Sequence, residues 1–354
     1  MHFKLTISAT MLAIGFALIG QPALADASNY DGTLPRPRPM QPVANTAAKA
    51  VDPAAPRPAS KPLPSPVSAS VAPAAKVDRT VPAKKLFGRK KTPANLRPRV
   101  YGGYTRGCLA GGKSLAINGD AWQVMRLSRN RNWGHPELID FLERLGKAAP
   151  GLGWRGLLVG DLAQPRGGPM LTGHRSHQLG LDADIWLKPM PAKTMSRKER
   201  ENVSAVSMLI KGTRKLNKKI WTTSRHRLIR QAAFDRRVAR IFVHPAIKKA
   251  LCDGAGTNRS WLRKVRPWKG HHYHFHVRLS CPPGNSACKN QKPPPSGDGC
   301  GKELSWWLSD APWKKAKKLK KPKKKKKKNK KPRKPRYVTM AQLPAACEQV
   351  LLAR

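Results

Sequence analysis

Two short segments of the chain alternate between apolar and polar side chains, which is the pattern of β-strands with one buried face. In 181–187 every second residue is aliphatic, and Asp182 and Asp184 fall on the opposite face. The alternation repeats in 272–279, where histidines occupy the polar face. Each segment therefore predicts a strand that gives one face to a core and the other face to a functional site.

Helical periods occur in the same part of the chain. Large apolar residues recur at helical spacing in 138–145, directly after a His-Pro pair, and a serine–glutamate capping box predicts a helix over 196–209. A further helix over 231–240 and a strand over 240–243 are expected. The predicted fold is α+β, with a small antiparallel sheet that carries the site and is flanked by helices and disulfide-braced loops.

Composition confines this fold to the middle of the chain. From Leu34 to about Pro98 the sequence consists of Pro, Ala, Ser and Lys with almost no large apolar residues, so we predict a disordered tether over 26–98. Residues 99–313 regain aromatic and aliphatic residues at structural periods and suffice for one domain. The C-terminal segment, 337–354, is expected to be tied back to that domain.

A strongly basic segment precedes the C-terminal segment. Residues 314–336 contain 17 Lys or Arg and no acid, and prolines prevent a long helix there. Removing these 17 charges from the net charge of +51 still leaves +34. Such charge attracts anionic partners irrespective of sequence: cell-wall polymer, lipopolysaccharide, a lipid membrane surface or nucleic acid. The alternative is a solvated tail, and no aromatic-interleaved motif indicates specific nucleic-acid recognition.

The N-terminus has the features of a secretory signal peptide. Lys4 precedes an apolar stretch from Ile7 to Ile19, and Ala23-Leu24-Ala25 fits a cleavage site. We predict that residues 1–25 are removed on export. The alternative is a retained anchor, which is disfavoured because the apolar stretch is short for a membrane span.

Six cysteines remain after this cleavage, and an even number of cysteines in an exported protein indicates disulfides. The sequence alone leaves their pairing open, although Cys281 and Cys288 enclose a Pro-Pro-Gly turn that could close a short loop. Cysteine ligands for zinc are the alternative. The lack of a Cys-x-x-Cys pair disfavours them.

The polar faces of the two predicted strands offer metal ligands. Asp184 and His276 project from the strands, and His177 can reach them from the preceding loop because Gly180 permits a tight approach. Two imidazoles and a carboxylate suit Zn²⁺ with an open position for water, whose pKa the metal lowers toward about 7. A neighbouring histidine can then take a proton or stabilise an oxyanion. The alternative is a hydrogen-bonded polar cluster without metal.

These residues resemble the signature of the LAS metallopeptidases, in which His-x-x-Gly-x-x-x-Asp is followed by His-x-His. Within that group, the segments 160–161, 164–169, 176–178 and 264–268 are similar to the penicillin-insensitive murein endopeptidases, peptidase family M74. The resemblance covers about 100–300 and the cysteine near the C-terminus. The proline-rich tether and the lysine run look like additions to the family pattern.

The resemblance implies roles for the site residues and the cysteines. It implies that zinc is held by His177, Asp184 and His276, and that His174 lies close enough to contact a metal. It also implies that His274 and His271 are catalytic, the alternative being that they only orient the ligands. The implied disulfides are Cys108–Cys347, Cys252–Cys300 and Cys281–Cys288.

The function implied by the resemblance is a periplasmic zinc endopeptidase that hydrolyses D-alanyl–meso-diaminopimelyl cross-links of peptidoglycan with metal-activated water. Because no serine acyl-enzyme is needed, β-lactams should not trap such an enzyme. One alternative is a D-alanyl-D-alanine carboxypeptidase with the same zinc cluster. Another is a non-catalytic wall-binding protein that uses its basic segments for adhesion.

The remaining polar residues have less specific expectations. In 191–231 the candidates for further ligands or bases are Glu199, Glu201 and His226, so we predict one main zinc. His272 is expected at the rim of the site, and Asp182 either orients a ligand or faces solvent. Arg166 is a candidate for binding a substrate carboxylate. The histidines expected to be structural are His135, His226 and His244.

Overall fold

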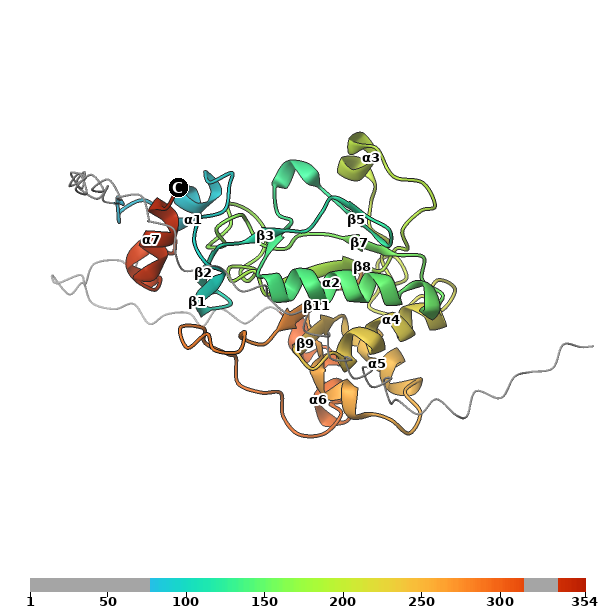
Figure 1. Ribbon diagram of the computed structural model, residues 1–354. Coiled ribbons are helices and arrows are strands. Elements are labelled where there is room, and N and C mark those ends of the chain that lie inside the picture. Colours follow the sequence, from blue (N-terminus) through green and yellow to red (C-terminus); the bar gives the residue numbers. More distant parts are fainter. Residues whose placement is uncertain (1–76, 315–336) are drawn as a thin grey trace, which may run out of the picture. The chain divides into compact units, whose positions relative to one another are not determined.

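Seven strands form one mixed sheet in the computed structural model, which describes residues 77–314 and 337–354 (Figure 1). From one edge to the other they are β10 (Val265–Pro267), β9 (Val238–Val243), β11 (His274–Leu279), β8 (Asp182–Trp186), β7 (Leu157–Val159), β5 (Trp122–Val124) and β4 (Asn118–Gly119). The pairs β10–β9 and β5–β7 are parallel, and the other pairs are antiparallel. The α+β class is confirmed, but the sheet is larger than expected and mixed, because its outer strands are too short to show a period.

Two small antiparallel pairs lie outside this sheet. The strands of the first are β1 (Arg99–Gly103) and β2 (Arg106–Ala110), and those of the second are β3 (Lys113–Ser114) and β6 (Trp133–Gly134). Strand β2 matters for the site, because Leu109 on it packs against the loop that precedes β8.

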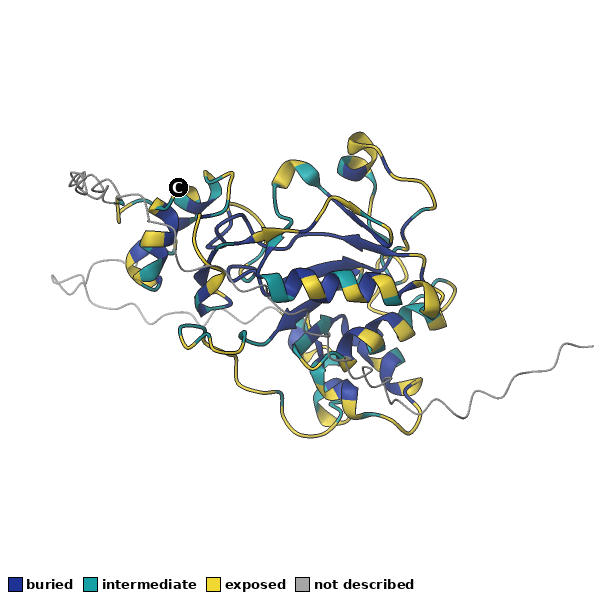
Figure 2. Cartoon of the chain, viewed as in Figure 1, coloured by how far each residue is buried: buried dark blue, intermediate teal, exposed yellow. Residues whose placement is uncertain are grey.

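Helix α2 (Pro136–Ala148) confirms the predicted helix after the His-Pro pair. His135 is its N-cap, and the Nδ1 atom of His135 accepts a hydrogen bond from the backbone N–H of Glu137 at 3.3 Å. The apolar stripe of α2 is buried in the same core as strands β7 and β8, and Figure 2 shows this stripe along the helix. The helix therefore covers one face of the sheet.

Four further helices differ from their predicted bounds or were not predicted. The capping box opens α3 (Arg197–Asn202) as expected, but the helix ends at Asn202 because the backbone N–H of Met208 pairs with the carbonyl of His272 at 2.7 Å instead. Helix α4 (Thr223–Phe234) lies earlier than the predicted 231–240, since Asp235 forms a turn that accepts the N–H of Arg237. Helices α5 (Pro245–Asp253) and α6 (Lys302–Leu308) were not predicted.

The structured part of the chain begins earlier than composition predicts. Helix α1 (Ala83–Gly88) buries Ala83 and Phe87 completely, in a cluster shared with α7 (Ala346–Leu352). The tether prediction is therefore wrong for the end of 26–98. Composition did not reveal this helix because the apolar residues that pack against Phe87 lie in the C-terminal helix, far away in the sequence.

The C-terminal segment is fastened to the domain by a disulfide and by a buried arginine. Cys347 of α7 is bonded to Cys108 of β2, and the other implied disulfides, Cys252–Cys300 and Cys281–Cys288, are present as well. Arg166 is buried and donates hydrogen bonds to the carbonyls of Val350 and Leu351 at 2.9 and 3.0 Å. A cation at the end of a helix stabilises its last carbonyls, so Arg166 is a structural residue and not a substrate ligand.

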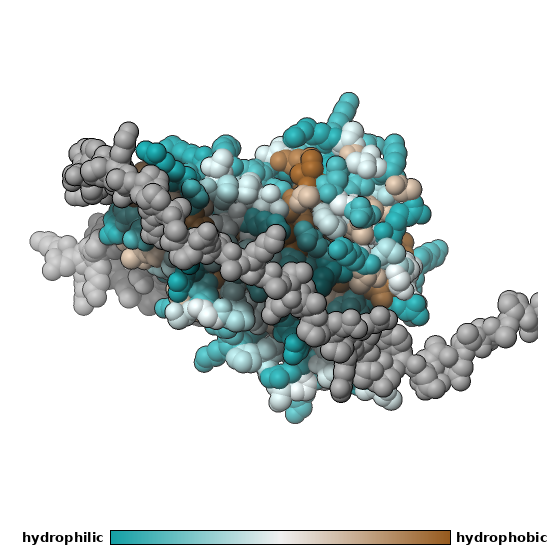
Figure 3. Space-filling model, in the orientation of Figure 1, coloured by the Kyte–Doolittle hydropathy of each residue, from teal (hydrophilic) through white to brown (hydrophobic). Residues whose placement is uncertain are grey.

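Several predicted segments lie outside the described residues. They are the signal peptide 1–25, the part of the tether up to residue 76, and 315–336 of the basic segment. Within the described ranges, no helix combines the length and the apolar character needed to cross a membrane. The face shown in Figure 3 is largely hydrophilic over the described residues, in keeping with the high charge of the chain.

Candidate functional site

Strand register places the predicted site residues in rows across the sheet. On the polar face, His276 of β11 lies opposite Asp184 of β8 and, on its other side, opposite Phe242 of β9. We call these three residues the ligand row. The intervening residues of β8 and β11 point to the other face and are fully buried in the core, as the alternation predicted: Ala183, Ile185, Phe275 and Val277.

The loop between β7 and β8 brings His177 to Asp184. The backbone of His177 is left-handed, with φ +65°, and its N–H donates to Oδ2 of Asp182 at 3.1 Å. Gly180 also has a left-handed backbone, and a Cβ atom there would come within 2.7 Å of Leu109. Only glycine fits this close approach, as the sequence predicted.

Asp184 is the centre of a histidine cluster. Its Oδ1 lies 3.1 Å from His276 Nδ1, 3.5 Å from His177 Nε2 and 3.6 Å from His274 Nε2. Its Oδ2 lies 3.5 Å from His174 Nε2. Burial raises the pKa of Asp184, but the charges of His274 and His177 hold that pKa well below its ordinary value. The structure thus gathers the three predicted histidine ligands around Asp184, the fourth predicted ligand.

This cluster fits a metal ion. The two ring nitrogens of His177 and Oδ1 of Asp184 are buried and make no hydrogen bond within the described residues. Ligand atoms of His174, His177 and Asp184 lie within 4.8 Å of one another. Buried polar atoms of this kind are costly unless a partner compensates them, and imidazoles with a carboxylate form the donor set of Zn²⁺.

Asp182 orients two of the predicted ligands. It is fully buried, and its Oδ1 accepts hydrogen bonds from His276 Nε2 and from Arg278 Nε, both at 2.7 Å. Because Nε2 of His276 is engaged in this way, its Nδ1 faces Asp184. Burial lowers the pKa of His276, but the hydrogen bond and charge of Asp182 raise it more. Of the two roles left open for Asp182, the structure supports the orienting one.

His174 lies beside the cluster and contacts a second carboxylate. Its Nε2 is 3.1 Å from Oδ2 of Asp161, which also pairs with Arg129 and Arg131 at 3.1 and 2.8 Å. Burial raises the pKa of Asp161, but the hydrogen bond of His174 and the charge of Arg131 lower it to about 2. When Nε2 donates a proton to Asp161, only Nδ1 of His174 keeps a lone pair for a metal, so the tautomer decides which nitrogen of His174 could be the ligand atom.

His274 and His271 lie together at one side of the cluster. Their ring centroids are 4.9 Å apart, and that of His271 is 5.8 Å from the ring of His276. Burial lowers the pKa of His274 to about 4 and that of His271 to about 3, so both imidazoles are neutral near pH 7. Nδ1 of His271 lies 2.8 Å from the carbonyl of Lys269 and carries the proton, which leaves its Nε2 as an acceptor.

The other candidates of the sequence have local partners away from the cluster. Nδ1 of His272 contacts the Ser207 hydroxyl at 2.9 Å. His226 packs against Trp261, and His244 is the N-cap of α5, as His135 is of α2. Glu199 belongs to the capping box of α3, and Glu201 accepts hydrogen bonds from Ser128. These contacts agree with structural roles.

Two cavities adjoin the cluster, and His174 lines both. One of about 320 Å³ has among its walls Asp161, Asp184, Trp186, Tyr273 and His274. The other, of about 910 Å³, has among its walls Arg240, Phe242, Trp268, His271 and His276. The arrangement can therefore hold peptide on two sides of one reacting group.

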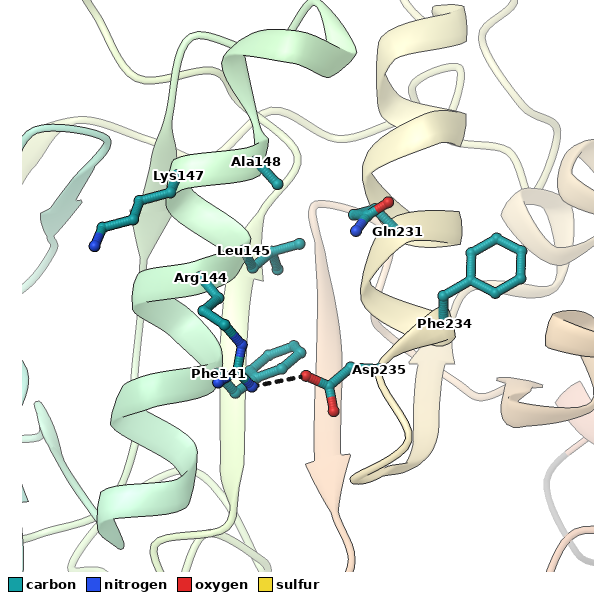
Figure 4. A pocket seen from close by; sticks show the side chains of 8 residues that line it. All are labelled: Phe141, Arg144, Leu145, Lys147, Ala148, Gln231, Phe234 and Asp235. Atoms are coloured by element: carbon teal, nitrogen blue, oxygen red, sulfur yellow. Dashed lines mark hydrogen bonds and ion pairs between the residues drawn. The ribbon is translucent and has the colours of Figure 1, made fainter. Parts of the chain in front are cut away.

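A further cavity, of about 530 Å³, lies between α2 and α4 (Figure 4). Phe141 and Leu145 line it from α2, and Arg144 of α2 forms an ion pair with Asp235 at 3.1 Å. It contains none of the clustered histidines. The candidate active site is therefore the cluster around Asp184.

Comparison with known proteins identifies the family. The family model for penicillin-insensitive murein endopeptidase matches residues 100–352. The murein endopeptidase of Haemophilus influenzae is 49% identical over 209 residues, which cover 58% of this chain and 72% of that protein. Those of Yersinia enterocolitica and Klebsiella pneumoniae are 42% and 41% identical over 216 residues, 61% of this chain and 78% of each relative. The chain belongs to the penicillin-insensitive murein endopeptidase family.

Proposed function

We propose that this protein is an exported zinc-dependent endopeptidase that hydrolyses the D-alanyl–meso-diaminopimelyl cross-links of peptidoglycan. The observation that carries the proposal is the meeting of His177, Asp184 and His276 Nδ1 beside the neutral His274. The names of the relatives and of the family model agree with this activity.

His177, Asp184 and His276 would hold the zinc ion. Bound there, zinc would polarise the scissile carbonyl and make a water molecule acidic near neutral pH. Asp182 keeps Nδ1 of His276 directed at the site and holds the backbone of His177 in place. His174 stays a candidate for contact with the metal.

Proton transfer falls to the neutral histidines. His274 is buried, and its low pKa leaves it unprotonated at neutral pH. It can accept the proton that the nucleophilic water loses, or, once protonated, donate a hydrogen bond to the developing oxyanion. His271 lies beside it with Nε2 as an acceptor and can share either task.

The two cavities favour an endopeptidase over a D-alanyl-D-alanine carboxypeptidase. A carboxypeptidase has to accommodate only one residue beyond the scissile bond, whereas a cross-link continues as peptide on both sides. The cavities of about 320 and 910 Å³ supply room on both sides of the cluster. A non-catalytic wall-binding protein has no need for either cavity beside buried, uncompensated imidazoles.

The location proposed for this activity is the periplasm, reached through the signal peptide of 1–25. Residues 314–336 would hold the enzyme near anionic envelope polymers or a membrane surface by charge alone.

Digestion of purified dimeric muropeptides tests the proposal. Mass analysis should show that the dimer is cleaved into its two monomers. Chelation should abolish this cleavage and added zinc should restore it. β-Lactams should not inhibit the cleavage. Release of a terminal D-alanine with the cross-link intact would instead identify a carboxypeptidase. Full activity of protein shown to be free of metal would exclude the zinc mechanism.

A further inference from the structure

We propose that Arg240 of β9 binds a carboxylate of the substrate peptide next to the scissile bond. The inference rests on the proposed function, because it names the group that recognises the substrate. It follows from how charges are distributed along the three strands that carry the site.

A second row of residues runs beside the ligand row. In this charge row, Arg278 of β11 lies opposite Asp182 of β8 on one side and opposite Arg240 of β9 on the other. Arg278 is neutralised by Asp182, at 2.7 Å. Like charges opposite each other on neighbouring strands are destabilising, so two arginines beside one aspartate leave a positive charge without compensation.

The uncompensated charge is that of Arg240. Its guanidinium donates a hydrogen bond to the backbone carbonyl of Lys292, and in 77–314 and 337–354 no carboxylate forms an ion pair with it. The third arginine nearby, Arg266, is paired with Glu303. Burial and then the charges of Arg266 and Arg278 lower the pKa of Arg240, which shows that its surroundings disfavour the cation.

Arg240 faces the larger of the two cavities at the site. It lines that cavity together with His271, His276 and Phe242. Two residues along a strand span about 7 Å, so the backbone of Arg240 lies about that far from the ligand row, or about two residues of an extended peptide. The long side chain of Arg240 lines the same cavity as the reacting centre. Two exposed arginines, Arg106 and Arg175, line the same cavity and make it more positive.

The proposed substrate has a carboxylate in the matching place. In a D-alanyl–meso-diaminopimelyl cross-link, the carbon attached to the scissile nitrogen carries a free carboxylate. A guanidinium can bind a carboxylate with two parallel hydrogen bonds, and a half-buried one without a counterion gains most from doing so.

The test compares two dimeric muropeptides that differ only in this carboxylate, which is free in one and amidated in the other. The proteins are the wild type, Arg240→Gln, the charge-conserving Arg240→Lys, and Arg227→Gln as a control for the same loss of charge at an exposed arginine of α4. The readouts are kcat and KM for each pair and the melting temperature of each protein.

We expect the wild type to prefer the free carboxylate by about 10- to 100-fold in kcat/KM, the effect of one charge-assisted contact. Arg240→Gln should lower kcat/KM by that factor for the substrate with the free carboxylate and leave kcat/KM for the amidated substrate unchanged. Arg240→Lys should lower kcat/KM for the free carboxylate by only part of that factor. Arg227→Gln should match the wild type on both substrates. Equal loss on both substrates, or no loss, would overturn the inference. If Arg240→Gln does not fold, equal cleavage of the two substrates by the wild type would overturn it as well. Failure of the wild type to cleave either dimer contradicts the proposed function instead.

Discussion

Buried histidines in two regions of this protein are in opposite hydrogen-bonding states. At the N-termini of α2 and α5, His135 and His244 each precede a proline and accept the backbone N–H of the residue two positions on. At the site, both ring nitrogens of His177 are buried without a hydrogen bond within the described residues. The hydrogen bonds at the helix caps stabilise the fold, whereas burying the ring nitrogens of His177 without hydrogen bonds destabilises it. Substitutions in the two regions should therefore have separable effects.

The largest effect is expected for Asp184→Ala. Loss of the central carboxylate should weaken zinc binding by more than about 100-fold and abolish cross-link hydrolysis, because one ligand and its negative charge are removed. In chelator, its free energy of unfolding should stay within about 1 kcal/mol of wild type, since a costly buried group is gone. Elemental analysis, muropeptide digestion and chemical denaturation check the three parts. A large loss of metal-free stability would contradict the distinction between the regions.

Next in size is His274→Ala, which should lower kcat by about 10²-fold or more while zinc stays bound. The neutral imidazole next to Asp184 is lost as base or hydrogen-bond donor, but no proposed ligand is removed. Turnover at measured zinc occupancy tests this prediction, with His272→Ala, whose imidazole contacts Ser207 away from the cluster, as a control. Near-normal turnover of the His274 variant would leave that histidine with a structural role.

Asp182→Asn should affect both properties, since Asp182 joins the site to the charge row. Replacing the charged acceptor of His276 Nε2 by a neutral amide should weaken zinc binding by about 10- to 100-fold. It also leaves the buried Arg278 without its carboxylate, which should destabilise the fold by about 3 kcal/mol or more. Competition with a chromogenic chelator measures the first effect, and denaturation in excess chelator measures the second. Unchanged zinc affinity would mean that Asp182 does not orient the ligand.

His244→Asn should change stability and its pH dependence, and leave turnover unaltered. Burial first, then His272 and Arg214, lower the pKa of His244 to about 4, below its ordinary 6.5. The unfolded state therefore binds the proton more readily, so stability present above pH 6.5 is lost as the pH falls toward 4. In asparagine the cap remains but nothing titrates, so about 1–2 kcal/mol of this loss should vanish.

Denaturation of the metal-free protein from pH 7 to pH 4 measures this effect. His244→Ala serves as the control, because it lacks the cap at every pH and should be less stable by about 1 kcal/mol. An identical pH dependence in wild type and His244→Asn would show that this cap does not titrate with folding.

The smallest effect on hydrolysis is expected for the basic segment. Replacing 315–336 by a Gly-Ser linker of equal length should leave turnover of soluble muropeptides unchanged, because no proposed site residue lies there. Attachment to intact sacculi should weaken and become less sensitive to salt, since fewer charges take part. Sedimentation across a salt series, beside turnover, measures both. Loss of turnover with unchanged attachment would assign the segment to the catalytic fold.

Local pattern accounts for the parts of the site that were predicted. Period-two alternation identified the strands of Asp184 and His276, and the apolar spacing after His135 identified α2. These signals are short in range, because one strand or one helix shows its period within a few residues. The implied ligand set was then recognised from residue types at characteristic spacing.

The roles of Asp182, Arg166 and Arg240 depend on contacts between segments far apart in the chain. The residues next to them in the sequence do not reveal these roles. Asp182 orients a ligand, Arg166 binds the carbonyls at the end of a helix, and Arg240 is a cation without a counterion among the described residues. Register decides, because pairing β8, β11 and β9 sets Asp182, Arg278 and Arg240 in one row. Likewise α7 turns Arg166 inward and buries Phe87. The sequence by itself determined which side chains are available for chemistry. Long-range strand pairing and helix packing decided which charges are neutralised and which face the substrate. The reason is that charges interact through space and not along the sequence.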